Sequence, residues 1–154
     1  MNLELNIVSG GQTGVDRAAL DFALDHGIPC GGFCPKGRLS EDGAISDRYP
    51  LTETSSTEYH ERTEQNVLGS DGTLIIYSDN LSGGTRYTFE YAKASENPLF
   101  LIDLIKPIRK DEFRSWMETY RIETLNIAGP RESQQPGIYQ RAIEILAILF
   151  EHSV

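Results

Sequence analysis

The stretch from Ser9 to Arg17, SGGQTGVDR, most constrains the fold because it joins a short apolar run to a helical pattern. The run before it ends in Ile7 and Val8, as a short strand does, and the apolar residues after it recur at helical spacing. A glycine-rich turn lets backbone N–H groups approach a ligand, and the N-terminus of the following helix attracts anions. A tight strand-to-helix turn also needs such glycines. Taken alone, the stretch supports both interpretations about equally.

The rest of the chain repeats the strand-then-helix pattern. Further strand signals stand at residues 28–33, 72–77, 99–102 and 124–128, and helix signals separate them. This alternation predicts an α/β fold, a three-layer sandwich with a mainly parallel sheet and helices on both faces. In such sheets the ligand crevice lies outside the carboxyl ends of the strands.

Three glycine loops therefore fall at one edge of the predicted sheet, and a basic segment with Lys36 and Arg38 lies at the same edge. Thr13 offers a hydroxyl and Arg17 a full charge one turn into the first helix. We predict an anion-binding site from these loops. Its candidate residues are Gly10, Gly11, Gln12, Thr13, Gly14, Arg17, Lys36, Arg38, Ser82, Gly83, Gly84, Thr85, Arg86, Thr88, Gly129, Pro130, Arg131, Glu132 and Ser133.

The basic residues belong to a long polar segment, residues 34–53, with little periodicity. Ordered loops of this length are usually functional, whereas their charge content also suits a solvated excursion. Both interpretations stay open.

Bulk properties limit the function classes. The 154 residues indicate one domain, residues 1–154, and a net charge of −9 argues against nucleic acid or an anionic membrane as partner. Neither a signal peptide nor an apolar run of about 20 residues is evident, so we expect a cytoplasmic protein. Cys30 and Cys34 lack the spacing and the nearby histidines of a redox or zinc site.

Catalytic constellations are not evident either. His26, His60 and His152 stand away from the glycine loops in sequence, which favours surface or capping roles. We predict no catalytic residue and no metal ligand. Asp16 and Glu132 are the carboxylates inside the candidate loops. Asp16 stands in the first turn of a helix, where an acidic side chain is expected for capping alone, whereas a carboxylate in these loops can also bind the edge of a pterin or purine.

With these segments in view, the chain resembles the molybdenum-cofactor carrier-like proteins of the Rossmann-like superfamily that includes the lysine-decarboxylase-like and DprA-like (SLOG) proteins. The likeness spans nearly the whole chain. It rests on GGQTGVDRAAL at 10–20, PKGRLSEDG at 35–43, YPLTE at 49–53, RTEQNV at 62–67, SDGTLII at 70–76, SGGTRYT at 82–88 and GPRES at 129–133.

The resemblance implies a homo-oligomeric Rossmann-like protein that binds the molybdenum cofactor, a phosphorylated molybdopterin, and stores, protects or delivers it without chemistry. Molybdoenzymes or cofactor-synthesis proteins are the implied partners. One related branch hydrolyses nucleoside monophosphates with P-G-G-x-G-T-x-x-E, and here the loop reads S-G-G-T-R-Y-T-F-E. Glu90 falls one residue short of that spacing, about 100° away on a helix. A phosphoribohydrolase and a nucleotide-derivative sensor remain the alternatives.

The last helix signal adds an expectation of a dimer or tetramer. Beside one core-facing stripe from Ile138 to Leu149, a second stripe holds Tyr139, Ile143 and Phe150. A helix that is apolar nearly all round is buried on both sides. We expect a symmetric partner to cover the second stripe, unless the long polar segment does so.

Overall fold

A computed structural model of the protein describes residues 4–151. Its main sheet has five strands in the order β2-β1-β9-β7-β8, and every neighbouring pair is parallel. This confirms the predicted α/β class with a parallel sheet. The strands are β1 (Asn6–Val8), β2 (Cys30–Gly31), β7 (Gly72–Tyr77), β8 (Leu99–Asp103) and β9 (Thr124–Ala128).

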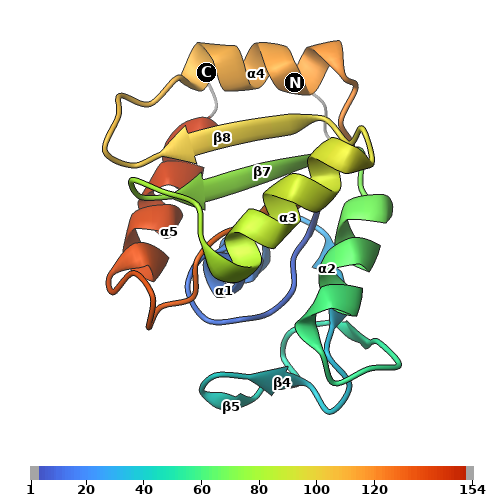
Figure 1. Cartoon of the computed structure of the whole chain (residues 1–154). Helices are drawn as coiled ribbons and strands as arrows, with labels where there is room; N and C mark the ends of the chain where they lie inside the picture. Colours follow the sequence, from blue (N-terminus) through green and yellow to red (C-terminus); the bar gives the residue numbers. More distant parts are fainter. Residues whose placement is uncertain (1–3, 152–154) are drawn as a thin grey trace.

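Helices cover both faces of this sheet (Figure 1). On one face α1 (Val15–Asp25) packs against α5 (Ile138–Leu149), and α4 (Lys110–Thr119) lies beside β8 and contacts α5. On the other face α2 (Tyr59–Leu68) packs against α3 (Gly83–Ala94). Between residues 4 and 151, no helix is long and apolar enough to cross a membrane.

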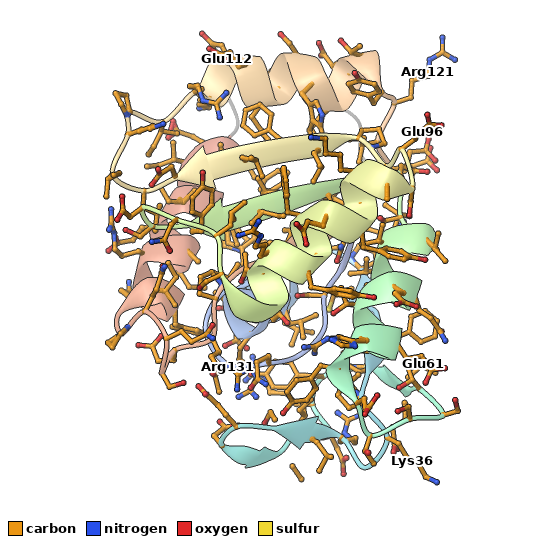
Figure 2. The ribbon with its side chains drawn as sticks, viewed as in Figure 1. Lys36, Glu61, Glu96, Glu112, Arg121 and Arg131 are labelled. Carbon is orange, nitrogen blue, oxygen red and sulfur yellow. The ribbon has the colours of Figure 1, made fainter. Side chains whose placement is uncertain are left out.

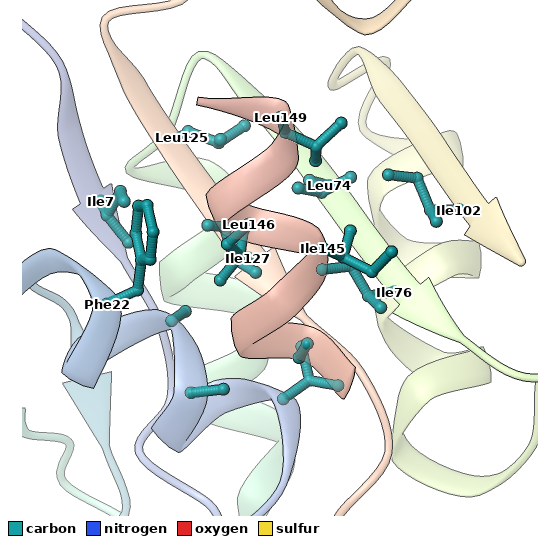
Figure 3. Packing of buried hydrophobic residues seen from close by; sticks show 14 of the residues in the cluster. Ile7, Phe22, Leu74, Ile76, Ile102, Leu125, Ile127, Ile145, Leu146 and Leu149 are labelled. Carbon is teal, nitrogen blue, oxygen red and sulfur yellow. The ribbon is translucent and has the colours of Figure 1, made fainter. Parts of the chain in front are cut away.

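The two faces of the sheet differ in chemistry. Leu74, Ile76, Leu125 and Ile127 point toward α5 and form the main apolar core with α1 and α4 (Figure 3). Because side chains alternate along a strand, their neighbours face α2 and α3. These neighbours include Thr73 and Asn126, which are buried and joined by a hydrogen bond of 3.3 Å from Asn126 Nδ2 to Thr73 Oγ1. The layer beneath α2 and α3 is therefore partly polar.

The long polar segment is ordered by short strands. Here β3 (Phe33–Cys34) pairs in parallel with β6 (Thr52–Glu53), and β4 (Leu39–Ser40) forms a hairpin with β5 (Gly43–Ala44). Arg38 organises the segment from within. Its guanidinium donates to the backbone carbonyls of Ile45, Ser46, Tyr49 and Leu51, at 2.6 to 3.3 Å.

The second stripe of α5 is partly covered within the chain. The ring of Phe150 lies 5.9 Å from that of Phe22 on α1 and 5.6 Å from that of Phe113 on α4. Ile143 packs against the main core, and the Tyr139 hydroxyl donates to Asp21 at 2.5 Å. α1 and α4 therefore cover part of this stripe, and Tyr139, Ile143 and Phe150 each stay partly exposed. The dimer or tetramer itself stays a prediction.

Candidate functional site

The connections of the sheet reverse direction around β9. From β1 the chain passes through α1 to β2 on one side, and from β7 it passes through α3 to β8 on the other. Such a switch point opens a crevice above the carboxyl ends of the strands. A pocket of about 70 Å³ lies there between α2, α3 and the loops after β1 and β9. It is lined by Gly10, Gln12, Asp16, Tyr59, His60, Arg62, Thr63, Asn66, Gly84, Thr85, Tyr87, Thr88, Asn126, Ala128, Gly129, Arg131 and Gln134.

Buried polar side chains are concentrated in this pocket. Ten polar or charged residues between residues 4 and 151 are buried, and seven of them line it. Burying a polar group without a partner is costly, and among residues 4–151 the one buried side-chain polar atom without a hydrogen-bond partner is Nε2 of Gln12. The seven are Gln12, Asp16, Arg62, Asn66, Thr85, Thr88 and Asn126.

The N-terminus of α3 opens toward the pocket at Gly84. No side chain caps this helix, and its first backbone hydrogen bond runs from Arg86 N to Ser82 O at 3.2 Å. Among residues 4–151, no acceptor takes the N–H groups of Gly83, Gly84 or Thr85. These N–H groups and the positive end of the helix dipole form an anion site.

Two guanidinium groups add positive charge to the pocket. Arg62 Nη1 donates to the Gly10 carbonyl at 2.8 Å, and the guanidinium lies 5.1 Å from the ring centre of Tyr59. Arg131 lies 5.9 Å from the same ring and 3.9 Å from Glu41. Figure 2 places Arg131 between the start of α3 and the β4–β5 hairpin. The chain is acidic overall, yet this pocket holds two arginines against one carboxyl, Asp16.

Asp16 is the buried acid of the pocket. Burial raises its pKa to about 6, against the opposing effect of Arg62, whose Nη1 lies 3.9 Å from Oδ2. That distance is beyond hydrogen-bond reach. Asp16 stands in the first turn of α1, after the N-cap Gly14, and interactions with the Gln12 backbone N–H and the Ser9 side chain also lower its pKa. The carboxyl lines the pocket.

The amide of Gln12 is oriented by its oxygen. Gln12 Oε1 accepts from the backbone N–H of Thr13 at 3.0 Å and of Glu41 at 2.9 Å. This fixes which end of the amide carries the nitrogen. Nε2 is buried and finds no partner among residues 4–151. A buried amide donor in a pocket wall is a group that a ligand can satisfy.

One wall of the pocket is aromatic. The ring of His60 stacks on Tyr87 with centroids 4.5 Å apart, and Tyr87 donates its hydroxyl to Glu64. This hydrogen bond is the main reason that the pKa of Tyr87 is raised to about 12. His60 is exposed, as a surface role predicts, and it also lines the pocket. His26 does lie at a helix end, with Nδ1 2.9 Å from Phe22 O, and His152 lies outside the described residues.

The structure brings part of the predicted site into the pocket. The predicted residues that line it are Gly10, Gln12, Gly84, Thr85, Thr88, Gly129 and Arg131. Ser82 and Gly83 open α3 beside it. Thr13, Gly14, Arg17, Glu132 and Ser133 line a neighbouring, more open cleft together with Glu41 and Asp42.

The remaining predicted residues lie elsewhere or hold the loops together. Arg86 pairs with Glu90, Lys36 is exposed, and Arg38 binds loop carbonyls. Glu132 accepts from the N–H groups at the start of α5. The Pro130 carbonyl accepts from the N–H of Val15, and Gly11 and Gly14 have positive φ, so both serve the turn.

Several lining residues escaped the sequence analysis. Tyr59, Arg62, Thr63 and Asn66 recur at helical spacing, so they form one face of α2, and this face is turned inward. The available signal was a helix with few apolar residues, which a soluble domain rarely buries unless its polar face serves a site. Asn126 sits inside an apolar strand, where a lone amide is equally informative.

Known proteins resemble this chain in sequence and in fold. A model of the circularly permutated YpsA SLOG family matches residues 7–150. The chain belongs to this family. The match confirms the resemblance to the SLOG superfamily, and no curated protein matches the chain. A crystal structure from Syntrophus aciditrophicus SB, of a protein provisionally named a molybdenum carrier, is similar at 47% identity over 94% of each chain, with a TM-score of 0.90.

Within this SLOG protein, Glu90 bears on the hydrolase alternative. The side chain lines a separate cleft with Arg86, and Arg86 Nε lies 3.4 Å from Glu90 Oε2. It does not line the pocket at the start of α3, where Thr88 lies instead. Between residues 4 and 151, no group of three or more His, Cys, Asp or Glu side chains is placed to hold a metal ion.

Proposed function

We propose that the pocket binds the molybdenum cofactor or a related phosphorylated pterin, which this protein stores, protects or delivers in the cytoplasm. One observation carries the proposal: the uncapped N-terminus of α3 meets the same pocket as the buried polar side chains. The N–H groups from Gly83 to Thr85, with Arg131, suit the phosphate. The polar groups around Asp16 and Gln12 suit the pterin ring.

The choice of a pterin rests on similarity. A protein 47% identical in sequence carries the provisional name of a molybdenum carrier. The pocket has the concave, partly polar form of small-molecule sites. Delivery to molybdoenzymes or to cofactor-synthesis proteins, by a homo-oligomer, belongs to the same proposal.

Cargo analysis tests the proposal. The protein is purified from a host that makes the cofactor, its pterin is released and oxidised to a fluorescent product, and its molybdenum is measured. We expect the wild type and Glu90→Gln to carry similar amounts of pterin, because Glu90 lies outside the pocket. Gly84→Val should lose the pterin. Pterin no higher in the wild type than in an unrelated protein prepared alongside would contradict the proposal.

A carrier is favoured over a phosphoribohydrolase because Glu90 lies outside the pocket and pairs with Arg86. Incubation with adenosine or guanosine monophosphate, followed by chromatography of free base, separates the two. We expect no base above the uncatalysed level. Release of base that disappears in a Glu90→Gln variant would support the hydrolase instead.

A further inference from the structure

The polar end of the pocket carries a donor without an acceptor. Gln12 is 6% exposed, and its Nε2 has no partner among residues 4–151. Hydrogen bonds to Thr13 and Glu41 hold its oxygen, so the amide cannot turn over without losing both. The free N–H is thus a fixed feature of the pocket wall.

The same wall carries an acceptor pair on Asp16, which is also 6% exposed. The nearest cation, Arg62, forms no hydrogen bond with this carboxylate. Arg62 Nη1 stands 3.9 Å from Oδ2 and donates to the Gly10 carbonyl at 2.8 Å instead. Above pH 6 the carboxylate is ionised and only accepts hydrogen bonds, since its pKa lies at about 6.

One carboxylate and one amide N–H together match a particular heterocycle edge. An edge with two neighbouring donors and one acceptor satisfies both side chains. Guanine and pterin share that edge, a ring N–H and a 2-amino group beside a 4-oxo-type carbonyl. Adenine presents a single amino donor beside a ring acceptor, and hypoxanthine lacks the amino group.

We propose that Asp16 and Gln12 read the 2-amino-4-oxopyrimidine edge of the ligand. In this arrangement the ring N–H and the 2-amino group donate to the Asp16 carboxylate, and the oxo group accepts from Gln12 Nε2. The inference rests on the proposed function and narrows its ligand class to pterins and guanine compounds. A pocket that hydrogen-bonds a ligand group rejects the analogue without it, because its own buried groups are then left unpaired.

The phosphate contacts lie on α3 and the ring contacts on α1 and the loop before it. Ligands that share one phosphate and differ in the edge of the base therefore measure the contribution of that edge to affinity. Guanosine and inosine monophosphate differ only in the 2-amino group, and adenosine monophosphate reverses the edge. Calorimetric titration of the full chain at pH 7.5, purified from a host that lacks the pterin cofactor, compares the three nucleotides without any mutation.

We expect guanosine monophosphate to bind at least tenfold more tightly than inosine monophosphate, and adenosine monophosphate to bind most weakly. Asp16→Asn should reduce the guanosine-to-inosine ratio to within about twofold. Gln12→Leu should weaken both of these nucleotides about equally and leave that ratio unchanged. Asp25→Asn makes the same charge change at an exposed position of α1 and should match the wild type.

The outcomes separate the two proposals. Equal affinities of the wild type for guanosine and inosine monophosphate, in a protein that carries pterin from a cofactor-producing host, would overturn the edge assignment alone. Absence of nucleotide binding together with absence of carried pterin would overturn both. Because the comparison of nucleotides uses the wild type, it tests the inference even if a variant misfolds.

Discussion

The buried carboxyl of Asp16 makes the stability of the folded protein depend on pH. In the folded protein burial holds its proton up to about pH 6, whereas a freely solvated aspartate releases it near 3.8. Its contribution to stability is therefore greatest at low pH and falls as the pH rises from 3.8 to 6. Asparagine does not titrate, so the comparison with Asp16→Asn removes the effects of other groups.

We predict that the unfolding free energy of the wild type, relative to Asp16→Asn, falls by about 2–3 kcal/mol between pH 4 and pH 7. Urea unfolding of both proteins across this range measures the difference. A difference that does not change with pH would show that the Asp16 carboxyl titrates normally.

Gly84 is the glycine whose replacement tests ligand approach most directly. A Cβ built there meets no atom within 4 Å, and the residue is not among those with positive φ. Gly84→Val should therefore unfold within about 1 kcal/mol of the wild type, yet lose ligand binding because the side chain fills the anion space. Thermal melting and pterin content measure the two effects. A stable variant with wild-type pterin content would show that the phosphate does not bind at the N-terminus of α3.

Gly11 would not serve the same purpose. Its φ is +82°, and a Cβ there meets Leu51 Cδ1 at 2.6 Å and Ile45 Cδ1 at 2.9 Å. Gly11→Val should therefore damage the fold as well as the loop, because the side chain strains the backbone and collides with the core of the polar segment.

At the scale of elements, the β4–β5 hairpin is fastened to the loop after β9 through Glu41. Its carboxylate accepts from the hydroxyls of Thr13 and Ser133 and from Ser133 N at 3.2 Å. Burial raises the pKa of Glu41, but the hydrogen bonds from Ser133 and Thr13 outweigh it and lower the pKa overall. The hairpin therefore depends on the ionised carboxylate.

We expect Glu41→Ala to lower the unfolding free energy by about 1–2 kcal/mol and to expose residues 38–44 to protease. Limited proteolysis with mass spectrometry locates the cut. Glu53→Ala, on the neighbouring strand β6, is the matched control, since its carboxylate bonds only to Gly37 N within this segment. Equal cleavage of both variants would show that Glu41 does not hold the hairpin.

Sequence reasoning recovered the elements that local pattern determines. β7 and β9 were predicted at their observed bounds, and β8 within one residue, because continuous apolar runs between turns mark buried strands. The predicted strand at 28–33 is divided in the structure between β2 and β3, and β4 to β6 were missed, since two-residue strands in a polar segment leave no apolar run to mark them. The same distinction holds for the site. The glycine loops are recognisable from local sequence, whereas the inward orientation of the polar face of α2 depends on the sheet beneath it.

The hydrogen bonds of the arginines show why counting charges in the sequence does not locate a site. Arg17 binds the Gly11 carbonyl and Asp42, and Arg38 binds four carbonyls of its own segment. Arg62, which stood outside the predicted site, lines the pocket. The acceptors that engage each guanidinium come from distant parts of the chain, so the sequence does not reveal which cations remain for a ligand.

At the scale of the whole molecule, the oligomer prediction now rests on a different surface. Phe150 and Ile143 pack against the core of their own chain, so a charged substitution at either would damage that core. On α5 the exposed large apolar residue is Ile148, at 39%. If a symmetric partner docks on α5, this residue lies where the partner can reach it.

We expect the wild type to be at least a dimer by light scattering at micromolar concentration, and Ile148→Glu to shift it toward monomer with its unfolding free energy changed by less than about 1 kcal/mol. Phe150→Glu, by contrast, should lose about 3 kcal/mol of stability, because a charge replaces a ring packed between Phe22 and Phe113. A monomeric wild type would contradict the oligomer. A dimeric Ile148→Glu variant would place the interface away from the exposed face of α5.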